Sequence, residues 1–276
     1  MINSKTGITG IFGWPVGHSL SPAMQNAAIG RAGLNYAYIP VEVKPGSLGR
    51  AVDSIRVLNF RGVNITVPHK ENIIKHLDGV SAAAKKIGAV NTIVNNSGKL
   101  IGHNTDWKGF LRSLKEHTQP RGKSVFMLGC GGAAKAVFYA LCQSGAKEIT
   151  VSDVDAKKAE NLKKSYACGG KVNSVSAKKA GNALRFADIF INATPVGMNA
   201  KDGAPVEKKF LRKGLFVFDV VYNRPTVLSR YAAEAGAEYV NGLDMLVYQG
   251  AESFELWFGK KPDLKLMKKI VREELK

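Results

Sequence analysis

Apolar positions along this chain alternate between two periodicities. Short runs rich in β-branched and aromatic residues are typical of buried strands, whereas longer stretches place apolar side chains three or four positions apart, as on one face of a helix. Strands that alternate with helices favour parallel sheets joined by crossover helices, so the predicted fold class is α/β. The predicted strands are residues 7–12, 36–43, 62–67, 124–128, 149–153, 188–192 and 215–221.

A predicted β-hairpin interrupts this alternation. Residues 89–94 and 99–105 flank Asn95-Asn96-Ser97-Gly98, a tetrapeptide of turn-forming residues. A helix should begin at Asp106, after which apolar side chains recur at helical spacing. The polar stretch 116–122 then separates this helix from the next strand, which indicates a connection between domains.

Two domains are therefore expected. We place the boundary near residue 107, so that residues 107–242 form a Rossmann-type, doubly wound domain. The helical segments from residue 243 onward should return to the first domain, which then comprises residues 1–106 and 243–276 and is mainly parallel α/β. We expect the binding site where the two domains meet, because such clefts commonly hold small ligands.

The strongest local signal is a glycine-rich turn that follows a predicted strand. Gly129-Cys130-Gly131-Gly132-Ala133-Ala134 has the Gly-x-Gly-x-x-Ala pattern and runs into a predicted helix. Such a turn lets the backbone approach a pyrophosphate, and the helix start supplies free amides and a positive dipole end. A purely structural turn is the alternative. The predicted contacts to a dinucleotide are Gly129, Cys130, Gly131, Gly132 and Ala133.

The next predicted strand ends in an acidic residue, Asp153, at the distance expected for a ribose contact. A carboxylate there accepts hydrogen bonds from an adenosine 2′-hydroxyl and repels a 2′-phosphate, which favours NAD. Asp153 or Asp155 could instead cap the helix predicted at 156–167; Asp155 fits that cap better and leaves Asp153 for the ribose. The nearby Lys157-Lys158 pair keeps NADP open as the alternative.

A second polar constellation follows the strand at 62–67. Alternation places Asn64 and Thr66 on the same face of this strand. Pro68 is expected to begin a helix with Lys70 in its first turn, where the positive end of the helix dipole disfavours a cation. Helix formation alone would not select a lysine there, so Lys70 is a candidate for proton transfer.

Motifs spread over nearly the whole chain resemble those of the shikimate dehydrogenase family. They occur in the family's order, and so many separate matches are far more specific than any one of them. These motifs are His18-Ser19-Leu20-Ser21-Pro22, Asn64-x-Thr66-x-Pro68-x-Lys70, Gly88-Ala89-Val90-Asn91-Thr92, Asn104-Thr105-Asp106, the glycine loop, Asn192-Ala193-Thr194-Pro195-x-Gly197-Met198, Asp219-Val220-Val221-Tyr222 and Gly242-Leu243-Asp244-Met245-Leu246-Val247-x-Gln249.

The resemblance implies the reversible, NAD(P)H-dependent reduction of 3-dehydroshikimate to shikimate in aromatic amino-acid biosynthesis, without a metal. It implies that Lys70 exchanges the proton of the reacting oxygen and that Asp106 orients the lysine and binds a ring hydroxyl. The substrate carboxylate would lie on Ser19 and Ser21. The ring would be positioned by Asn64, Thr66, Asn91, Tyr222 and Gln249, and the dinucleotide would also contact Asn192, Ala193, Thr194, Val220 and Gly242.

Several of these residues also have structural alternatives. Ser21 suits a helix N-cap, Asp106 could cap the connecting helix, Asn91 could serve turn chemistry, and Gln249 could be a structural polar residue. One departure concerns the cofactor: NADP-specific members usually carry Asn-Arg-Thr/Ser where this chain has Asp153-Val154-Asp155. In this respect the chain is similar to the NAD-using branch, which often accepts quinate.

Composition changes this picture little. The net charge of +18 could steer anionic ligands, and a nucleic-acid face is the remote alternative; the lysine pairs lack interleaved aromatics and favour a solvated surface. Three cysteines without metal-ligand spacing suggest free thiols in a reducing cytoplasm, with Cys130 a filler side chain. No apolar run predicts a membrane span, and no membrane or nucleic-acid partner is expected for this monomer or homodimer.

Overall fold

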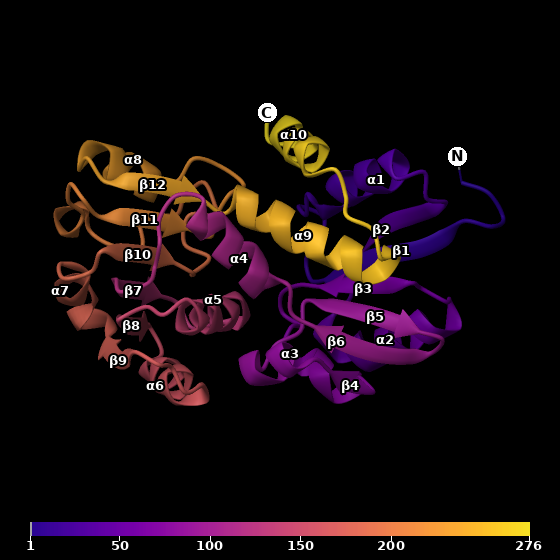
Figure 1. The fold of residues 1–276 in the computed structure, drawn as a ribbon, viewed down its shortest axis with the longest axis horizontal. Coiled ribbons are helices and arrows are strands. Elements are labelled where there is room, and N and C mark those ends of the chain that lie inside the picture. Colours follow the sequence, from indigo (N-terminus) through magenta and orange to yellow (C-terminus); the bar gives the residue numbers. More distant parts are fainter. Residues whose placement is uncertain (1) are drawn as a thin grey trace. The chain divides into compact units, whose positions relative to one another are not determined.

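The computed structural model describes residues 2–276 and divides into two compact units. Unit 1 contains the residues up to Gly109 together with Val247–Lys276, and unit 2 contains Phe110–Leu246. Each unit has its own six-stranded sheet with helices packed against it (Figure 1). The predicted α/β class with two separate sheets is confirmed.

The sheet of unit 1 is mixed, with the strand order β2-β1-β3-β5-β6-β4. β1 pairs in parallel with both β2 and β3, and β4 pairs in parallel with β6, whereas β5 is antiparallel to β3 and β6. The β5–β6 pair is the predicted hairpin, and Ser97 and Gly98 form its turn with positive φ angles. The strands are β1 (Gly7–Gly13), β2 (Tyr36–Glu42), β3 (Gly62–Ile65), β4 (Gly79–Val80), β5 (Thr92–Asn96) and β6 (Lys99–His103).

Amphipathic helices close the core of unit 1. Trp257 is fully buried, and its indole N–H donates to the carbonyl of Ile93 at 3.0 Å, which ties the end of α9 to the sheet. No side chain would fit at Gly62, where a Cβ would run into this indole ring. The helices of this unit are α1 (Ser21–Arg31), α2 (Leu48–Val57), α3 (Ala82–Ile87), most of α9 (Leu243–Phe258) and α10 (Leu264–Glu274); the 3₁₀ helices are η1 (Pro45–Ser47) and η2 (Asn72–His76).

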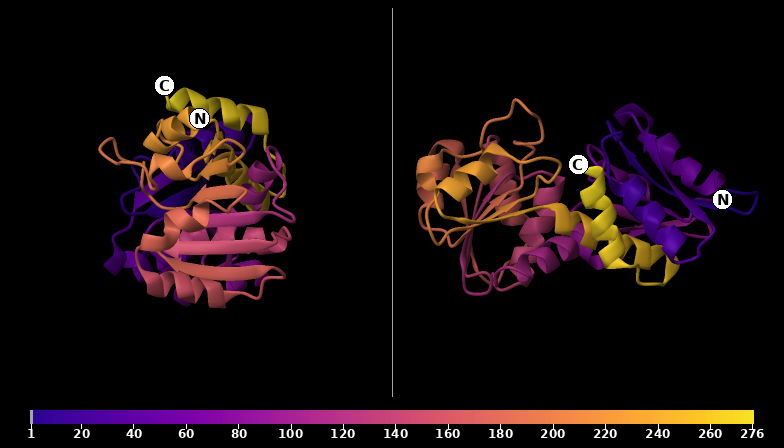
Figure 2. Two further views of the ribbon diagram at one scale, coloured as in Figure 1. Left: turned by 90° about the vertical axis from the view of Figure 1, so that its left-hand side faces the viewer. Right: turned by 90° about the horizontal axis from the view of Figure 1, so that it is seen from above.

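The sheet of unit 2 is entirely parallel, with the order β12-β11-β10-β7-β8-β9. Read from β9, this is the 3-2-1-4-5-6 arrangement of a doubly wound nucleotide-binding sheet, with helices on both faces (Figure 2). The strands are β7 (Ser124–Leu128), β8 (Glu148–Asp153), β9 (Lys171–Ser176), β10 (Ile189–Asn192), β11 (Phe216–Asp219) and β12 (Glu238–Asn241). The helices are most of α4 (Asp106–Lys115), α5 (Gly132–Gln143), α6 (Ala156–Ser165), α7 (Ala180–Leu184) and α8 (Val227–Glu234), with 3₁₀ helices η3 (Ala177–Lys179) and η4 (Lys208–Phe210).

The core of unit 2 is formed by apolar side chains of the central strands. Phe126 and Phe190 stack on neighbouring strands with their ring centroids 5.8 Å apart, and both are fully buried. This packing explains why these strands read as continuous apolar runs in the sequence, as expected for a sheet covered on both faces. Within the described residues, none of the helices combines the length and the apolar character needed to cross a bilayer.

Candidate active site

The segment that carries Lys70 differs from its prediction. Instead of an α-helix from Pro68, the chain forms a turn and only then the short 3₁₀ helix η2. The His69 N–H donates to the carbonyl of Thr66 at 2.9 Å, and the buried His69 imidazole Nε2 lies 2.6 Å from the carbonyl of Val43. The local turn bond and the long-range contact to Val43 hold the segment, so the expected placement of Lys70 in the first turn of a helix was wrong.

Lys70 forms a buried ion pair with Asp106 in unit 1. Its Nζ lies 2.7 Å from Oδ2 of Asp106, and the two side chains are only 15% and 7% exposed. Asp106 is the first residue of α4, but its carboxylate is engaged with side chains, which favours a chemical role over the helix cap that the sequence left open. The ammonium group has three N–H donors, so the pair leaves Lys70 able to donate to a reacting oxygen.

Asn91 fixes the other oxygen of Asp106. Its Nδ2 lies 2.8 Å from Oδ1 of Asp106 and 3.2 Å from Oε1 of Gln249, and its Oδ1 accepts from the Thr105 N–H at 2.7 Å. Asn91 thus joins the turn before β5, the start of α4 and helix α9. Both Asn91 and Asp106 are buried, so their orientations are set by the protein before any ligand arrives.

A second polar cluster lies beside this one. Asn64 is buried on β3; its Oδ1 accepts from the Tyr38 hydroxyl at 2.8 Å, and its Nδ2 faces Ser253 Oγ at 3.0 Å and Thr92 Oγ1 at 3.1 Å. Tyr38 also bonds to the side chain of Ser21, and burial raises the pKa of this phenol well above its usual value. Tyr38 therefore couples two of the predicted substrate residues.

The seryl pair at the start of α1 is positioned without helix capping. The helix begins at Ser21 itself, with Leu20 at the cap position and no side-chain cap bond, so the suggested capping role of Ser21 was wrong. The Ser21 N–H instead donates to Ser19 Oγ at 3.3 Å. Thr66 lies at the end of β3, where its N–H bonds to the carbonyl of Phe12 at 2.9 Å.

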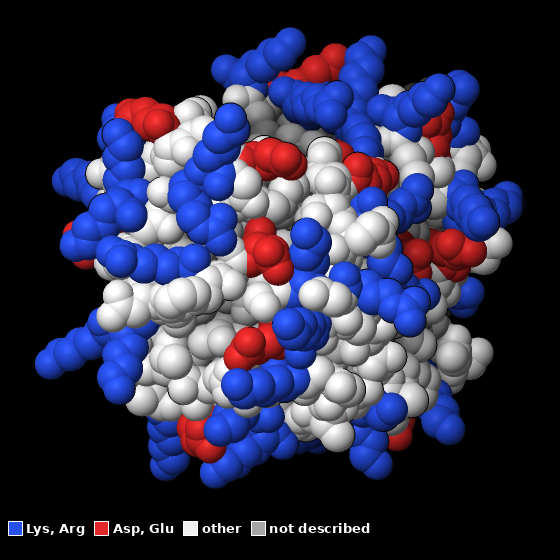
Figure 3. Space-filling model, turned by 60° about the vertical axis from the view of Figure 1, so that its left-hand side comes forward, with Lys and Arg blue, Asp and Glu red and all other residues white. Residues whose placement is uncertain are grey.

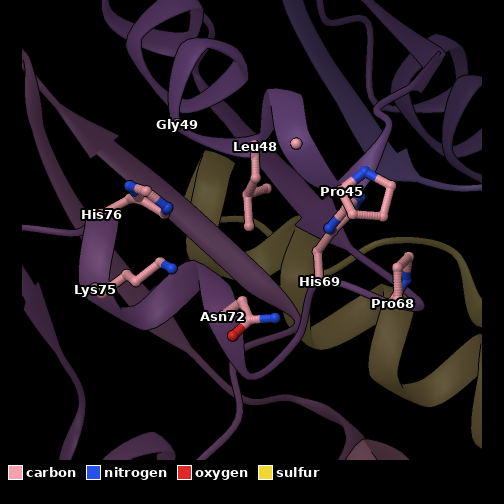
Figure 4. Close-up of a pocket in the computed structure, with 9 residues that line it drawn as sticks. Pro45, Leu48, Gly49, Pro68, His69, Asn72, Lys75 and His76 are labelled. Atoms are coloured by element: carbon pink, nitrogen blue, oxygen red, sulfur yellow. The ribbon is translucent and has the colours of Figure 1, made fainter.

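A separate pocket of about 380 Å³ lies behind the Lys70 segment (Figure 4). His69 and Pro68 line one side of this pocket, and Asn72, Lys75 and His76 line the other. Its lining contains neither Lys70 nor Asp106. Pro68 and His69 thus face this pocket, and the His69 ring holds the turn through its contact with the carbonyl of Val43.

The glycine loop of unit 2 has the geometry that the sequence predicted. Gly129 has a φ of +102°, and a Cβ there would lie 2.7 Å from the carbonyl oxygen of Ala193, so only glycine fits. Gly131 is the N-cap of α5, and a Cβ at this position would meet nothing within 4 Å. Gly131 is exposed and Gly132 and Ala133 are half-buried, so the backbone at the start of α5 is open to approach by a ligand phosphate.

The carboxylate of Asp153 is hydrogen-bonded to the backbone of the glycine loop, which the sequence did not suggest. Its Oδ2 accepts from the Cys130 N–H at 2.8 Å, and its Oδ1 accepts from the Asp155 N–H at 2.9 Å. Asp155 caps α6 as predicted, through bonds from the N–H groups of Lys157 and Lys158. Asp153 is thus not free, although each carboxylate oxygen keeps a second lone pair for a ribose hydroxyl.

The remaining predicted dinucleotide residues follow the strand ends of unit 2. Asn192 ends β10, Ala193 and Thr194 begin the loop after it, Val220 follows β11, and Gly242 follows β12. A Cβ at Gly242 would collide with the carbonyl group of Val220, so these two backbone segments are in direct contact. Tyr222 lies in unit 2, two residues beyond Val220, whereas the other predicted substrate residues lie in unit 1.

Three regions of the chain match sequence models of one family. Residues 11–93 match the shikimate dehydrogenase substrate binding domain, residues 113–225 match shikimate / quinate 5-dehydrogenase, and residues 242–272 match the shikimate 5′-dehydrogenase C-terminal domain. The NADP(+) shikimate dehydrogenase of Pyrococcus furiosus is 45% identical over 98% of this chain and 97% of its own. The chain belongs to the shikimate dehydrogenase family.

Solved structures of the family agree. A shikimate dehydrogenase in complex with NADP+ superposes with a TM-score of 0.94 at 38% identity, covering 100% of this chain and 98% of the other. The quinate dehydrogenase of Corynebacterium glutamicum in complex with NAD gives a TM-score of 0.90 at 33% identity, covering 97% and 99%. Relatives of this one fold therefore differ in cofactor and in substrate.

One sequence expectation about cysteines is wrong for this family member. Cys142 and Cys168 form a disulfide with their Cα atoms 4.9 Å apart, and only Cys130 is a free thiol, which is buried. The end of α5 and the segment after α6 also meet through Tyr139 and Tyr166, whose rings lie 5.1 Å apart. The spacing of 26 residues gave no sign of this contact, because the fold creates it. The cytoplasmic location stays a prediction.

Burial, and to a smaller extent the neighbouring Asp153 carboxylate, raise the pKa of the Cys130 thiol to about 12. A thiol that stays protonated is a poor nucleophile, so Cys130 is inert packing inside the loop, as the sequence suggested.

The excess of basic residues is spread over the surface. Lys and Arg cover the visible face in Figure 3 without gathering in one patch, as in a solvated surface.

Sequence reasoning missed several polar residues that support the site. Ser253 faces Asn64 and Thr92 from α9, and it lies one helical turn after Gln249, a spacing that could have revealed it. Tyr38 sits in an apolar strand that carries no polar signal. Asp219, fully buried at the end of β11, stood in a quoted motif without an assigned role.

Proposed function

We propose that this chain is a shikimate dehydrogenase, which reduces the ring ketone of 3-dehydroshikimate to the alcohol of shikimate and catalyses the reverse oxidation. The observation that carries this proposal is the buried pair of Lys70 and Asp106, held by Asn91 in a chain that also carries a dinucleotide loop. In this assignment unit 1 supplies every substrate residue except Tyr222, and unit 2 binds the dinucleotide. The nicotinamide supplies or accepts the hydride at the ring carbon.

Lys70 performs the proton transfer. In reduction, its ammonium donates a proton to the oxygen of the former ketone as negative charge develops there, and in oxidation the neutral amine removes that proton from the hydroxyl. Asp106 holds the amine through the 2.7 Å contact and keeps it from adopting other rotamers. Its Oδ1, oriented by Asn91, can also accept from a neighbouring ring hydroxyl. Lys70 thus contacts the reacting oxygen of the substrate, and Asp106 contacts the hydroxyl beside it.

The substrate carboxylate is assigned to the seryl hydroxyls of Ser19 and Ser21 at the start of α1, where the helix dipole favours an anion. Asn64, Thr66, Asn91, Tyr222 and Gln249 are assigned to the ring hydroxyls. The bond between Tyr38 and Asn64 and the bond between Tyr38 and Ser21 support this assignment, because they hold both side chains in place before the substrate binds. Preorganised donors of this kind lose little entropy when the substrate binds.

NAD is the dinucleotide that the loop favours, and NADP is the alternative. Asp153 ends β8 and Asp155 caps α6, and both carboxylates would repel a 2′-phosphate. Relatives with NADP(+) in their names argue the other way, as do Lys157 and Lys158 at the start of α6. Quinate is the second candidate substrate, because a relative named quinate dehydrogenase is bound to NAD and shares this fold.

A kinetic grid of shikimate and quinate against NAD and NADP tests these assignments together. We expect the highest kcat/KM for shikimate with NAD. Turnover of quinate above that of shikimate would replace the substrate assignment, and a tenfold preference for NADP would overturn the reading of the two carboxylates. Absence of turnover with all four combinations would refute the proposed function. An enzyme of this size is expected to act as a monomer or homodimer.

A further inference from the structure

Four neighbouring strands of unit 2 end at the same level. Leu128, Asn192, Asp219 and Asn241 are the last residues of β7, β10, β11 and β12, and they stand opposite one another in the sheet register. The residue that follows each strand, Gly129, Ala193, Val220 or Gly242, is one that the sequence predicts to contact the dinucleotide. The geometry of this edge therefore decides where the dinucleotide lies.

Asp219 is the charged residue of this row, and it is fully buried. Its Oδ1 accepts from Asn192 Nδ2 at 2.9 Å and from the Val221 N–H at 3.1 Å. Its Oδ2 accepts from Thr226 Oγ1 at 3.0 Å and from the Tyr239 hydroxyl at 3.1 Å. One carboxylate thus joins β10, the loop after β11, the cap of α8 and β12.

The bond to Asn192 has a directional consequence. Asn192 Oδ1 accepts from the N–H and the hydroxyl of Thr194, at 3.2 and 2.7 Å. If the amide of Asn192 turned over, its NH₂ group would face these two donors. A carboxylate at Asp219 accepts only, so it prevents this turn and fixes the loop that begins at Ala193.

That loop packs against the glycine loop without spare room. The Ala193 carbonyl oxygen lies 2.7 Å from the position of a Cβ on Gly129, and Thr226 Cγ2 would lie 3.0 Å from a Cβ on Gly197. A shift of the Ala193 loop by a fraction of an ångström would therefore reach the pyrophosphate-binding turn. On the other side, the backbone of Val220 touches Gly242 in the same way.

We propose that Asp219 is a positioning residue for the dinucleotide: its buried carboxylate orients Asn192 and holds the loops of Ala193 and Val220 where the nicotinamide half binds. This inference rests on the proposed function of unit 2. Asp219 itself touches no ligand in this assignment and acts through Asn192 and Val221. A merely structural carboxylate would lower stability when removed but leave dinucleotide affinity unchanged in the fraction that still folds.

The test compares Asp219→Ala with Asp219→Asn in the full-length protein. Asp219→Asn keeps one carbonyl oxygen for Asn192 and Val221, and its amide can donate to the two hydroxyls, which can accept. We expect Asp219→Ala to raise the Kd for NADH at least tenfold in a fluorescence titration, with the KM for shikimate changed less than twofold. Asp219→Asn should remain within threefold of the parent in both quantities.

A folded Asp219→Ala protein with the parent's Kd for NADH would overturn the proposal. If that variant does not fold, Thr226→Val decides, because it removes one donor to Oδ2, and Thr226→Ser is its matched control. We expect the Kd for NADH to rise at least threefold in Thr226→Val and to stay at the parent value in Thr226→Ser. Equal Kd values for the two variants would contradict the positioning role of Asp219. A parent protein that oxidises shikimate while all variants bind NADH normally refutes this inference alone; a parent that binds neither NADH nor NADPH refutes both.

Discussion

The disulfide between Cys142 and Cys168 should make a large contribution to the stability of unit 2. The two cysteines are 26 positions apart in the sequence, and closing a loop of this length lowers the entropy of the unfolded chain by an amount worth roughly 3.5 kcal/mol at 25 °C. A change of this size corresponds to a shift in Tm of roughly 7–14 °C for a unit of this size. The perturbation is reduction of the bond or the double substitution Cys142→Ser and Cys168→Ser.

Thiol counting and thermal unfolding form the assay. A thiol reagent should detect no thiol in the native protein, because Cys130 is 4% exposed and its pKa is about 12, one thiol after denaturation without reductant, and three after reduction. Unfolding followed by circular dichroism should show the fall in Tm on reduction for the parent but not for the double variant. Three thiols without reductant, or reduced and oxidised parent proteins that unfold within 2 °C of each other, would refute the reasoning.

Three further variants test the site itself. Asp106→Asn should lower kcat roughly 10²-fold, because a neutral amide holds the Lys70 ammonium less firmly than the carboxylate does, while the Kd for NADH stays unchanged; a normal kcat in this steady-state assay contradicts the assigned pair. Asp153→Asn should narrow the preference for NAD over NADP that we expect in the parent, since it removes a charge that repels the 2′-phosphate, and an unchanged kcat/KM ratio argues against that repulsion. Gly129→Ala should raise the KM for the dinucleotide at least tenfold, because a Cβ at φ +102° meets the Ala193 carbonyl; a KM within twofold of the parent shows that the loop can adapt.

Features that depend on neighbours in sequence were predictable from the chain alone. The glycine loop could be read because its turn and helix start involve only consecutive residues. The hairpin of β5 and β6 followed from its turn residues, and Asp155 was correctly identified as a cap. The cap bonds of Asp155 join residues two and three positions apart, and the hairpin depends on the residues of its turn, so the local sequence carries the information.

Features that depend on distant contacts were not predictable in this way. The turn at Lys70 is held by His69 and the carbonyl of Val43, 26 positions away, and this contact overrides the helix that Pro68 suggested. Ser21 bonds to Tyr38 and does not cap its helix. The disulfide arises because the crossover topology brings two helix ends together. Such partners become visible only when the fold is known.

The candidate site shows both cases side by side. Lys70 and Asp106 were named from motif residues 36 positions apart, and the structure brings them within 2.7 Å. The residues that support the neighbouring polar cluster were harder to find: Tyr38 lies in an apolar strand, and the spacing of Ser253 from Gln249 was the one available signal. Packing from other elements determines those roles, as it does for the carboxylate of Asp219.

The kcat of Lys70→Ala for shikimate oxidation tests the proposed mechanism most directly. Loss of the amine that transfers the proton should lower kcat roughly 10²–10⁴-fold, while circular dichroism and the Kd for NADH remain those of the parent. A folded variant that binds NADH and turns over shikimate within threefold of the parent rate would show that Lys70 and its partner Asp106 do not carry the chemistry.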